Sequence, residues 1–285
     1  MPDRPRNVGA SVRQRLLNLA HARGQPMELL LTRYALERLL HRLSLSPHRE
    51  RFVLKGAMLL ATWFDEPHRA TRDLDLLGFG DAAEAALLAT FREIMAVEVD
   101  DGVNFDLKGL RIEAIREEVE YGGSRLRTTA TLAGARIPIT VDIGFGDAVE
   151  PGVEDIDLPV LLDMPSPHLR AYPPETVIAE KFHAMVVLGR ANSRMKDYYD
   201  VWMLTSTLAI NPERLQRAIT ATFARRITLV PIEVPDGLSD AFAADPGKRR
   251  QWDSFARDLS AQTPTLQSLV WQLRQALATL LHLAN

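Results

Sequence analysis

Two aspartates that lie one residue apart, Asp73 and Asp75, are the residues of this sequence best suited to metal-dependent chemistry. If they lie in a β-strand, their side chains share one face about 7 Å apart, while Leu74 and Leu76 turn to the other face. Two like charges at that distance repel each other unless a cation lies between them. Oxygen ligands of this kind suit a hard divalent ion such as Mg²⁺, which can present a phosphate to a nucleophile. The pair therefore favours nucleotidyl transfer.

An exposed edge strand with alternating charges and no function would also contain such a pair, but three further features favour a site. Lys55 and Gly56 form a turn upstream, Arg72 adjoins the pair, and Asp142 follows in a second apolar strand. Lys55, Gly56 and Arg72 would bind the nucleotide, with the two cationic side chains neutralising its phosphate charge. Asp142 would complete the metal site and help to deprotonate the attacking hydroxyl.

The chain predicts an α+β fold in which a catalytic core has helices before and after it. Apolar periodicity predicts helices over residues 10–22, 26–43, 57–64, 82–96, 174–188, 195–208, 212–224, 247–259 and 264–283. Strands are expected over residues 52–54, 71–79, 109–119, 125–132 and 136–145, with a short extended piece over 226–234. Six prolines make residues 147–174 loop-like. We expect an N-terminal helical segment (1–50), a core (51–160) and a mainly helical C-terminal domain (161–285).

A second group of charged residues lies in this C-terminal region. Asp197 and Asp200 are three apart and hence neighbours on one helix face. Ordinary surface charges would explain the group, with Lys196 and Asp200 as a helical pair. Lys181, however, stands among apolar residues, where a solvated lysine is not expected. It would hold a triphosphate, and an aspartate would fix that lysine or the nucleophile. The nearby His183 has no second ligand at metal-binding spacing and is expected to pack between helices.

Composition indicates an ordinary globular protein of 285 residues, with 46% hydrophobic and 25% charged residues. The absence of cysteine excludes disulfides and thiolate sites. The N-terminal residues lack the apolar run of a signal peptide, and no apolar stretch is long enough to span a membrane. We therefore expect a cytoplasmic protein with no membrane association.

The net charge of −3 hides an excess of arginine near the N-terminus, because residues 1–51 hold ten arginines against four acidic residues. Arginines grip phosphates bidentately, which favours a nucleic-acid partner. A solvated helix surface in an arginine-rich protein would explain the same composition. The candidate RNA contacts in this segment are Arg13, Arg15, Arg33, Arg38 and Arg42.

The combined motifs resemble the AbiEii-type nucleotidyltransferase toxin family, in particular its MenT-like members. The resemblance extends over residues 50–205 and rests on five motifs in order. They are Phe52-Val53-Leu54-Lys55-Gly56-Ala57, Arg72-Asp73-Leu74-Asp75, Tyr121-Gly122-Gly123-Ser124-Arg125-Leu126, Val141-Asp142-Ile143-Gly144-Phe145-Gly146-Asp147, and Glu180-Lys181 with Lys196-Asp197-Tyr198-Tyr199-Asp200.

That resemblance implies a DNA-polymerase-β-like nucleotidyltransferase core and a reaction that uses a nucleoside triphosphate and one or two Mg²⁺ ions. MenT-like members transfer nucleotides to the acceptor end of tRNA, so it also implies tRNA and a cognate antitoxin protein as partners, and no DNA. By similarity, Asp73 and Asp75 bind metal and Lys181 binds the nucleotide. The essential helix carboxylate is Asp197 or Asp200.

The chain departs from the family pattern at its first motif. Gly56 is followed by Ala57 where the family often has a second glycine or a serine, which removes one potential phosphate contact. Asp73 lies seventeen positions after Gly56, and the insert Trp63 to Ala70 would form a distinct rim. Backbone amides after Gly56 can still provide a phosphate contact. A protein or small-molecule acceptor, or a binding protein that has lost catalysis on the same fold, remains as an alternative.

Overall fold

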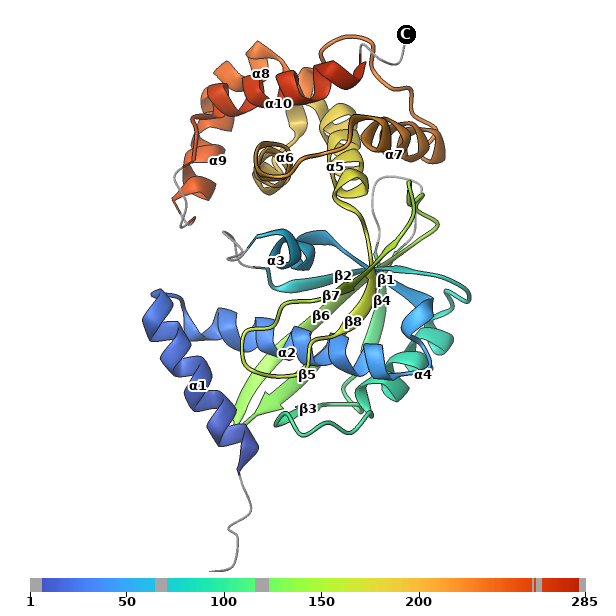
Figure 1. Cartoon of the computed structure of the whole chain (residues 1–285), viewed down its shortest axis with the longest axis vertical. Helices are drawn as coiled ribbons and strands as arrows, with labels where there is room; N and C mark the ends of the chain where they lie inside the picture. The colour runs from blue at the N-terminus through green and yellow to red at the C-terminus, as the bar shows by residue number, and fades with distance from the viewer. Residues whose placement is uncertain (1–6, 65–70, 116–122, 258, 260–262, 282–285) are drawn as a thin grey trace, which may run out of the picture. The chain divides into compact units, whose positions relative to one another are not determined.

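The structure is a computed structural model that describes residues 7–64, 71–115, 123–257, 259 and 263–281 (Figure 1). The chain divides into two compact units. The first consists of Met1–Gly146 with Asp155–Ala171, and the second consists of Asp147–Glu154 with Tyr172–Asn285.

The first unit is built on a mixed β-sheet with the strand order β3-β5-β6-β2-β1-β8-β7, in which β4 also pairs with β5. Strands β2 and β6 run parallel, as do β1 and β8, whereas β1–β2 and β5–β6 are antiparallel. The strands are β1 (Phe52–Lys55), β2 (Asp73–Gly78), β3 (Val103–Phe105), β4 (Arg111–Ile115), β5 (Gly123–Leu132), β6 (Ala135–Phe145), β7 (Glu154–Asp157) and β8 (His168–Ala171). The helices of this unit are α1 (Val8–Arg23), α2 (Met27–Leu45), α3 (Leu60–Trp63) and α4 (Glu84–Met95), with 3-10 turns η1 (Arg49–Arg51) and η2 (Gly56–Leu59).

Alternation of apolar and polar residues determines which face of the sheet is buried. In β6 the side chains of Ile137, Ile139, Val141 and Ile143 are at most 2% exposed, while the residues between them remain accessible. This buried face is covered by α2 and α4, whose leucines line the core (Figure 1). Burying each such side chain contributes about 1.5–3 kcal/mol. The opposite face of the sheet is therefore left for polar side chains.

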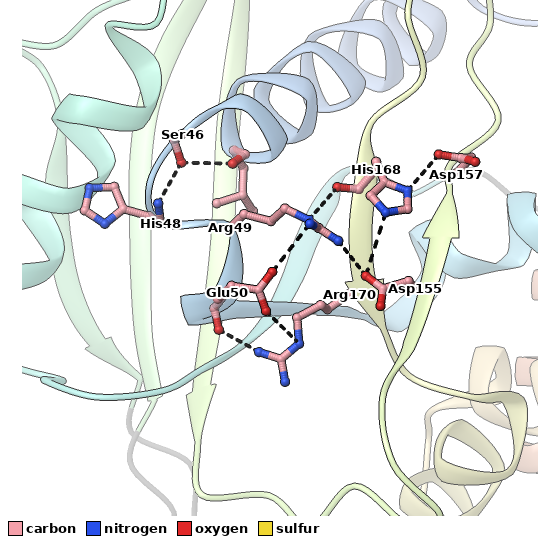
Figure 2. Close-up of polar contacts among 9 residues, drawn as sticks. Ser46, His48, Arg49, Glu50, Asp155, Asp157, His168 and Arg170 are labelled. Carbon is pink, nitrogen blue, oxygen red and sulfur yellow. Dashed lines mark hydrogen bonds and ion pairs between the residues drawn. The ribbon is translucent and has the colours of Figure 1, made fainter.

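Part of the region predicted as a loop, residues 147–174, forms strands β7 and β8, so that prediction was wrong there. Figure 2 shows how Arg49 of η1 ties both strands to the unit, through the His168 carbonyl at 3.1 Å and the Asp155 carboxylate at 2.5 Å. Arg170 likewise donates to the carbonyl of Glu50 at 2.6 Å (Figure 2). Strands of four residues with so many charges and flanking prolines lack the apolar alternation by which strands are recognised.

Other boundaries of the first unit differ from expectation in smaller ways. The helix expected over 57–64 is divided into η2 and α3, and β3 was not anticipated. The strand expected over 109–119 is observed as β4, and its last residues, 116–119, lie outside the described part of the chain.

The second unit is helical in its described residues, as expected. It comprises α5 (Pro174–Leu188), α6 (Met195–Thr207), α7 (Pro212–Arg225), α8 (Asp240–Ala244), α9 (Pro246–Ala256) and α10 (Leu266–Leu281), with turns η3 (Gly189–Ala191) and η4 (Asp236–Leu238). Proline in the first turn and side-chain caps start α7 and α9, where Asn211 and Asp245 accept hydrogen bonds from backbone amides. Tyr198 stacks on Phe242 in the core, with ring centroids 5.1 Å apart.

The extended piece expected over 226–234 forms no strand, although all of these residues are described. The backbone of Ile227 adopts a left-handed conformation with φ of 49°, which turns the chain at the end of α7. Pro231 lacks the amide hydrogen that a strand ladder needs. No helix in the described part of the chain is long and apolar enough to cross a membrane.

Candidate active site

The Asp73–Asp75 pair lies on strand β2, with both side chains on the accessible face of the sheet. Asp73 is exposed and Asp75 is half-buried, whereas Leu74 and Leu76 lie in the core at 0% and 1% exposure. The shared face that the sequence predicted for the two carboxylates is therefore confirmed.

The register of the neighbouring strands brings two more predicted site residues beside Asp75. Lys55 of β1 is its partner in the antiparallel pair, and Asp142 of β6 is its partner in the parallel pair. Register partners lie on the same face of a sheet, with neighbouring strands about 4.8 Å apart. The cluster of Lys55, Asp73, Asp75 and Asp142 is hereafter called the aspartate cluster. Its members come from three strands that only the folded topology makes adjacent.

Gly56 is fixed at the edge of this cluster by both its backbone and its surroundings. Its φ is +73°, a conformation that side chains other than glycine rarely adopt. A Cβ atom added there would lie 2.1 Å from Oδ2 of Asp75, so the carboxylate packs directly against the glycine backbone. Glycine is thus required for the position of Asp75.

Arg125 of β5 is a further member of the site that the sequence analysis did not assign a role. Its Nε donates to Oδ1 of Asp142 at 2.7 Å and its terminal nitrogen donates to Oδ2 at 2.6 Å. The pKa of Arg125 is raised above its usual value by these hydrogen bonds to Asp142, and also by the charges of Asp142, Asp73 and Asp75. A hairpin that turns at Ala133-Gly134 pairs positions 125 and 142, so the sequence contained a signal for this contact.

The donor chemistry of the aspartate cluster suits a hard divalent cation, because it consists of carboxylate oxygens. In the conformation described here, however, both oxygens of Asp142 are engaged by Arg125. Among the described residues, no three histidine, aspartate or glutamate side chains are grouped in a way that could hold a metal ion. The carboxylates of Asp73, Asp75 and Asp142 would hold a divalent cation once Arg125 releases an oxygen of Asp142.

Arg72, the remaining basic residue predicted for the nucleotide, is exposed directly before β2. The insert expected to form a rim falls mostly on residues 65–70, which lie outside the described residues. So do Tyr121 and Gly122 of the third family motif.

The second unit contains the other predicted group, and its residues do come together. Nζ of Lys181 on α5 lies 2.5 Å from Asp197 and 2.9 Å from Asp200 on α6. The side chains are 15%, 9% and 1% exposed respectively. The interpretation as ordinary surface charges is therefore wrong for these three residues, because two carboxylates and one ammonium group form a nearly buried cluster. Lys196, the alternative partner of Asp200, is exposed.

His183 packs between helices, as the sequence predicted. Its ring makes an edge contact with Phe223, with centroids 4.9 Å apart, and its Nε2 lies 3.1 Å from the Thr228 hydroxyl. Burial and the neighbouring Arg226 lower the pKa of His183 to about 4. The imidazole is therefore neutral at physiological pH, and it anchors the turn after α7.

Two of the five N-terminal arginines proposed as RNA contacts are buried, and a third is paired along its own helix. Arg38 and Arg42 are 0% and 3% exposed, and Arg33 pairs with Glu37 on the next helical turn at 2.9 Å. Arg42 forms a bidentate bond with the buried Asp101 at 2.6 and 3.1 Å. Arg38 and Arg42 tie α2 to the segments that contain Pro165 and Asp101, so the interpretation of the segment as an RNA-gripping surface was wrong for these two buried side chains.

Comparison with known structures gives the class of the fold. The chain is similar to the crystal structure of JHP933 from Helicobacter pylori, with a TM-score of 0.51 and 16% sequence identity, over 91% of this chain and 94% of that one. A further H. pylori crystal structure, described as that of a candidate nucleotidyltransferase, gives a TM-score of 0.49 and 15% identity over 91% and 96% of the two chains. The protein thus shares its mixed α/β fold with the JHP933 structure.

Comparison of the sequence with protein families gives a more specific result. The family described as "Nucleotidyl transferase AbiEii toxin, Type IV TA system" matches residues 38–279. This match covers most of the chain, and the protein belongs to the AbiEii nucleotidyltransferase toxin family. The resemblance inferred from the motifs is therefore confirmed, and membership of a toxin–antitoxin family implies an antitoxin partner. No curated protein matches the sequence.

Proposed function

We propose that this protein is the nucleotidyltransferase toxin of a toxin–antitoxin system, and that it transfers nucleotides from a nucleoside triphosphate to RNA with release of pyrophosphate. The proposed acceptor is the 3′ end of tRNA. The observation that carries the proposal is the register of β1, β2 and β6, which brings Lys55, Asp75 and Asp142 side by side with Asp73 on one accessible face. Membership of the AbiEii family supports the reaction class.

In this proposal the sheet is a DNA-polymerase-β-like core and the aspartate cluster is its catalytic centre. Asp73, Asp75 and Asp142 would hold one or two Mg²⁺ ions, which supply Lewis-acid stabilisation of the charge that develops on the phosphates. Once Arg125 releases it, Asp142 would help to deprotonate the attacking hydroxyl, and Gly56 keeps the Asp75 carboxylate in place. Lys55 and Arg72 bind phosphate oxygens and offset their charge.

Lys181 is proposed to bind the nucleotide, on the basis of its chemistry and its support by two carboxylates. Asp197 and Asp200 both contact its ammonium group, and a lysine held in one rotamer loses less entropy when it binds a phosphate. A helical pair between Lys196 and Asp200 would engage Asp200 and so favour Asp197 as the essential carboxylate. Because Asp200 pairs with Lys181, that argument no longer separates the two.

Transfer to a protein or small molecule is the second candidate, because burial of Arg38 and Arg42 removes part of the case for RNA. A protein that binds without catalysis is disfavoured by the three aspartates that the sheet brings together. We further propose that the protein acts in the cytoplasm, and that neither DNA nor a membrane is a partner.

The test is to incubate the purified protein with each α-labelled nucleoside triphosphate, Mg²⁺ and total cellular RNA and protein. Label that is removed by ribonuclease and migrates with tRNA supports the proposal. Label that only protease removes would replace RNA with a protein acceptor. The Asp73→Asn variant is the matched control, since it changes one charge and preserves the shape of the side chain.

A further inference from the structure

The aspartate cluster is continued across the sheet by residues of opposite charge. On the accessible face, Asp75 lies beside Asp142, Asp142 lies beside Arg125, and Arg125 lies beside Glu113 of β4. In this row, Arg125 donates to both carboxylate oxygens of Asp142, at 2.7 and 2.6 Å, and so joins one aspartate of the candidate metal site to a guanidinium group.

We propose that Arg125 is a resident counter-ion of the aspartate cluster, which occupies Asp142 when no divalent cation is bound and competes with that cation for the carboxylate. Arg125 is thus a positioning residue that acts through Asp142. This inference rests on the metal site of the proposed function, and it adds an account of how the affinity of that site is set.

The charge of Arg125 determines the expected direction of its effect on cation affinity. The three carboxylates on this face repel one another, and the guanidinium group, together with the ammonium group of Lys55, offsets part of that repulsion. The same positive charge repels an incoming divalent cation and saturates both oxygens of one ligand. The Asp142 and Arg125 side chains are 21% and 36% exposed, so solvent screens the interaction only in part. Removal of Arg125 is therefore expected to tighten cation binding by about tenfold.

Arg127 provides a matched control on the same strand. It lies two residues from Arg125, so its side chain shares the face, and its exposure of 40% is similar. Its charged partner is Glu113 at 3.2 Å, and its register partner on β6 is Thr140. Substitution of Arg127 thus removes an equal charge from the same surface without freeing an aspartate of the cluster.

The experiment is calorimetric titration of Mg²⁺ into the full-length wild type, Arg125→Met and Arg127→Met, without nucleotide. We expect the Kd for Mg²⁺ to fall about tenfold in Arg125→Met and to change less than about twofold in Arg127→Met. In thermal unfolding, the gain in Tm between EDTA and Mg²⁺ should be larger in Arg125→Met than in the wild type. An unchanged or weaker Mg²⁺ affinity in Arg125→Met, or an equal gain in both arginine variants, overturns the proposal.

Two further variants keep the test decisive. Arg125→Lys retains the positive charge but cannot donate to both oxygens of Asp142 as the guanidinium group does. It should therefore bind Mg²⁺ with intermediate affinity, and it remains testable if Arg125→Met does not fold. In the background of Asp142→Asn, Arg125→Met should produce much less tightening, because the carboxylate for which arginine competes is absent. Equal tightening in both backgrounds contradicts competition at Asp142. These readouts use no nucleotide, so lack of transfer activity in the wild type would overturn the proposed function and not this one.

Discussion

Replacement of Lys181 by alanine is expected to destabilise the second unit strongly, because it leaves two carboxylates without their nearest cation. Asp200 is 1% exposed and Asp197 is 9% exposed, so neither is well solvated after the change. Removing one partner of a buried ion pair typically costs about 3–5 kcal/mol. For a unit of this size, that corresponds to a fall in Tm of roughly 10 °C or more.

The assay is thermal and urea-induced unfolding of Lys181→Ala beside Lys196→Ala, an exposed lysine whose loss should change stability by less than about 0.5 kcal/mol. The double variant Lys181→Ala/Asp200→Asn should recover part of the lost stability, since it removes one of the two carboxylate charges that Lys181 contacts in the wild type. The free energy of unfolding of Lys181→Ala could instead lie within about 0.5 kcal/mol of the wild-type value, which is the size of a surface effect. That result would contradict the assignment of these residues to a buried cluster. Transfer activity of Lys181→Ala must be measured below its lowered Tm, so that loss of nucleotide binding is distinguished from unfolding.

Three other outcomes follow from the structure. Gly56→Ala should cost about 1–2 kcal/mol of backbone strain and displace the Asp75 carboxylate. Nucleotide transfer should therefore fall, while urea unfolding shows that the protein is still folded. Normal transfer would contradict the close contact between Gly56 and Asp75. Folding holds the pKa of His183 at about 4, below its unfolded value near 6.5. Its contribution to stability is therefore complete above about pH 6.5 and is lost as the pH falls towards 4, by an amount on the order of 3 kcal/mol. That portion of the pH dependence should be absent in His183→Gln unfolding curves. Arg42→Glu should prevent stable folding, as judged by circular dichroism, because it places like charges in a buried pair; a folded variant with weakened RNA binding would restore the surface interpretation.

The polar face of the sheet was predictable from the sequence because alternation is a local property. In β2 and β6, apolar residues at every second position are sufficient to assign Asp73, Asp75 and Asp142 to accessible faces. The proximity of Asp75 and Asp142 depends on a parallel pairing between strands far apart in sequence. From the sequence, only the family resemblance indicated that Asp75 and Asp142 belong to one site.

Buried charge was the main feature that composition could not reveal. An arginine on a predicted helix is normally assigned to the surface, yet Arg38 and Arg42 are covered by loops that include Pro165 and Asp101. The sequence left open whether an aspartate fixes Lys181 or the nucleophile, because a local Lys196–Asp200 pair on α6 was equally consistent with it and the observed contact joins two helices. Strands β7 and β8 are anchored by Arg49 and Arg170 instead of by an apolar pattern.

The central claim, that the aspartate cluster catalyses nucleotide transfer, is tested most directly by label incorporation in the wild type, Asp73→Asn and Asp75→Asn under identical conditions. With Mg²⁺ and α-labelled nucleoside triphosphates, the wild type should label RNA. Both variants should remain folded and lose at least about a hundredfold in rate, the scale on which a charge-stabilising catalytic group acts. Transfer by either variant at the wild-type rate, or wild-type transfer that persists in EDTA, would contradict the assignment of the site.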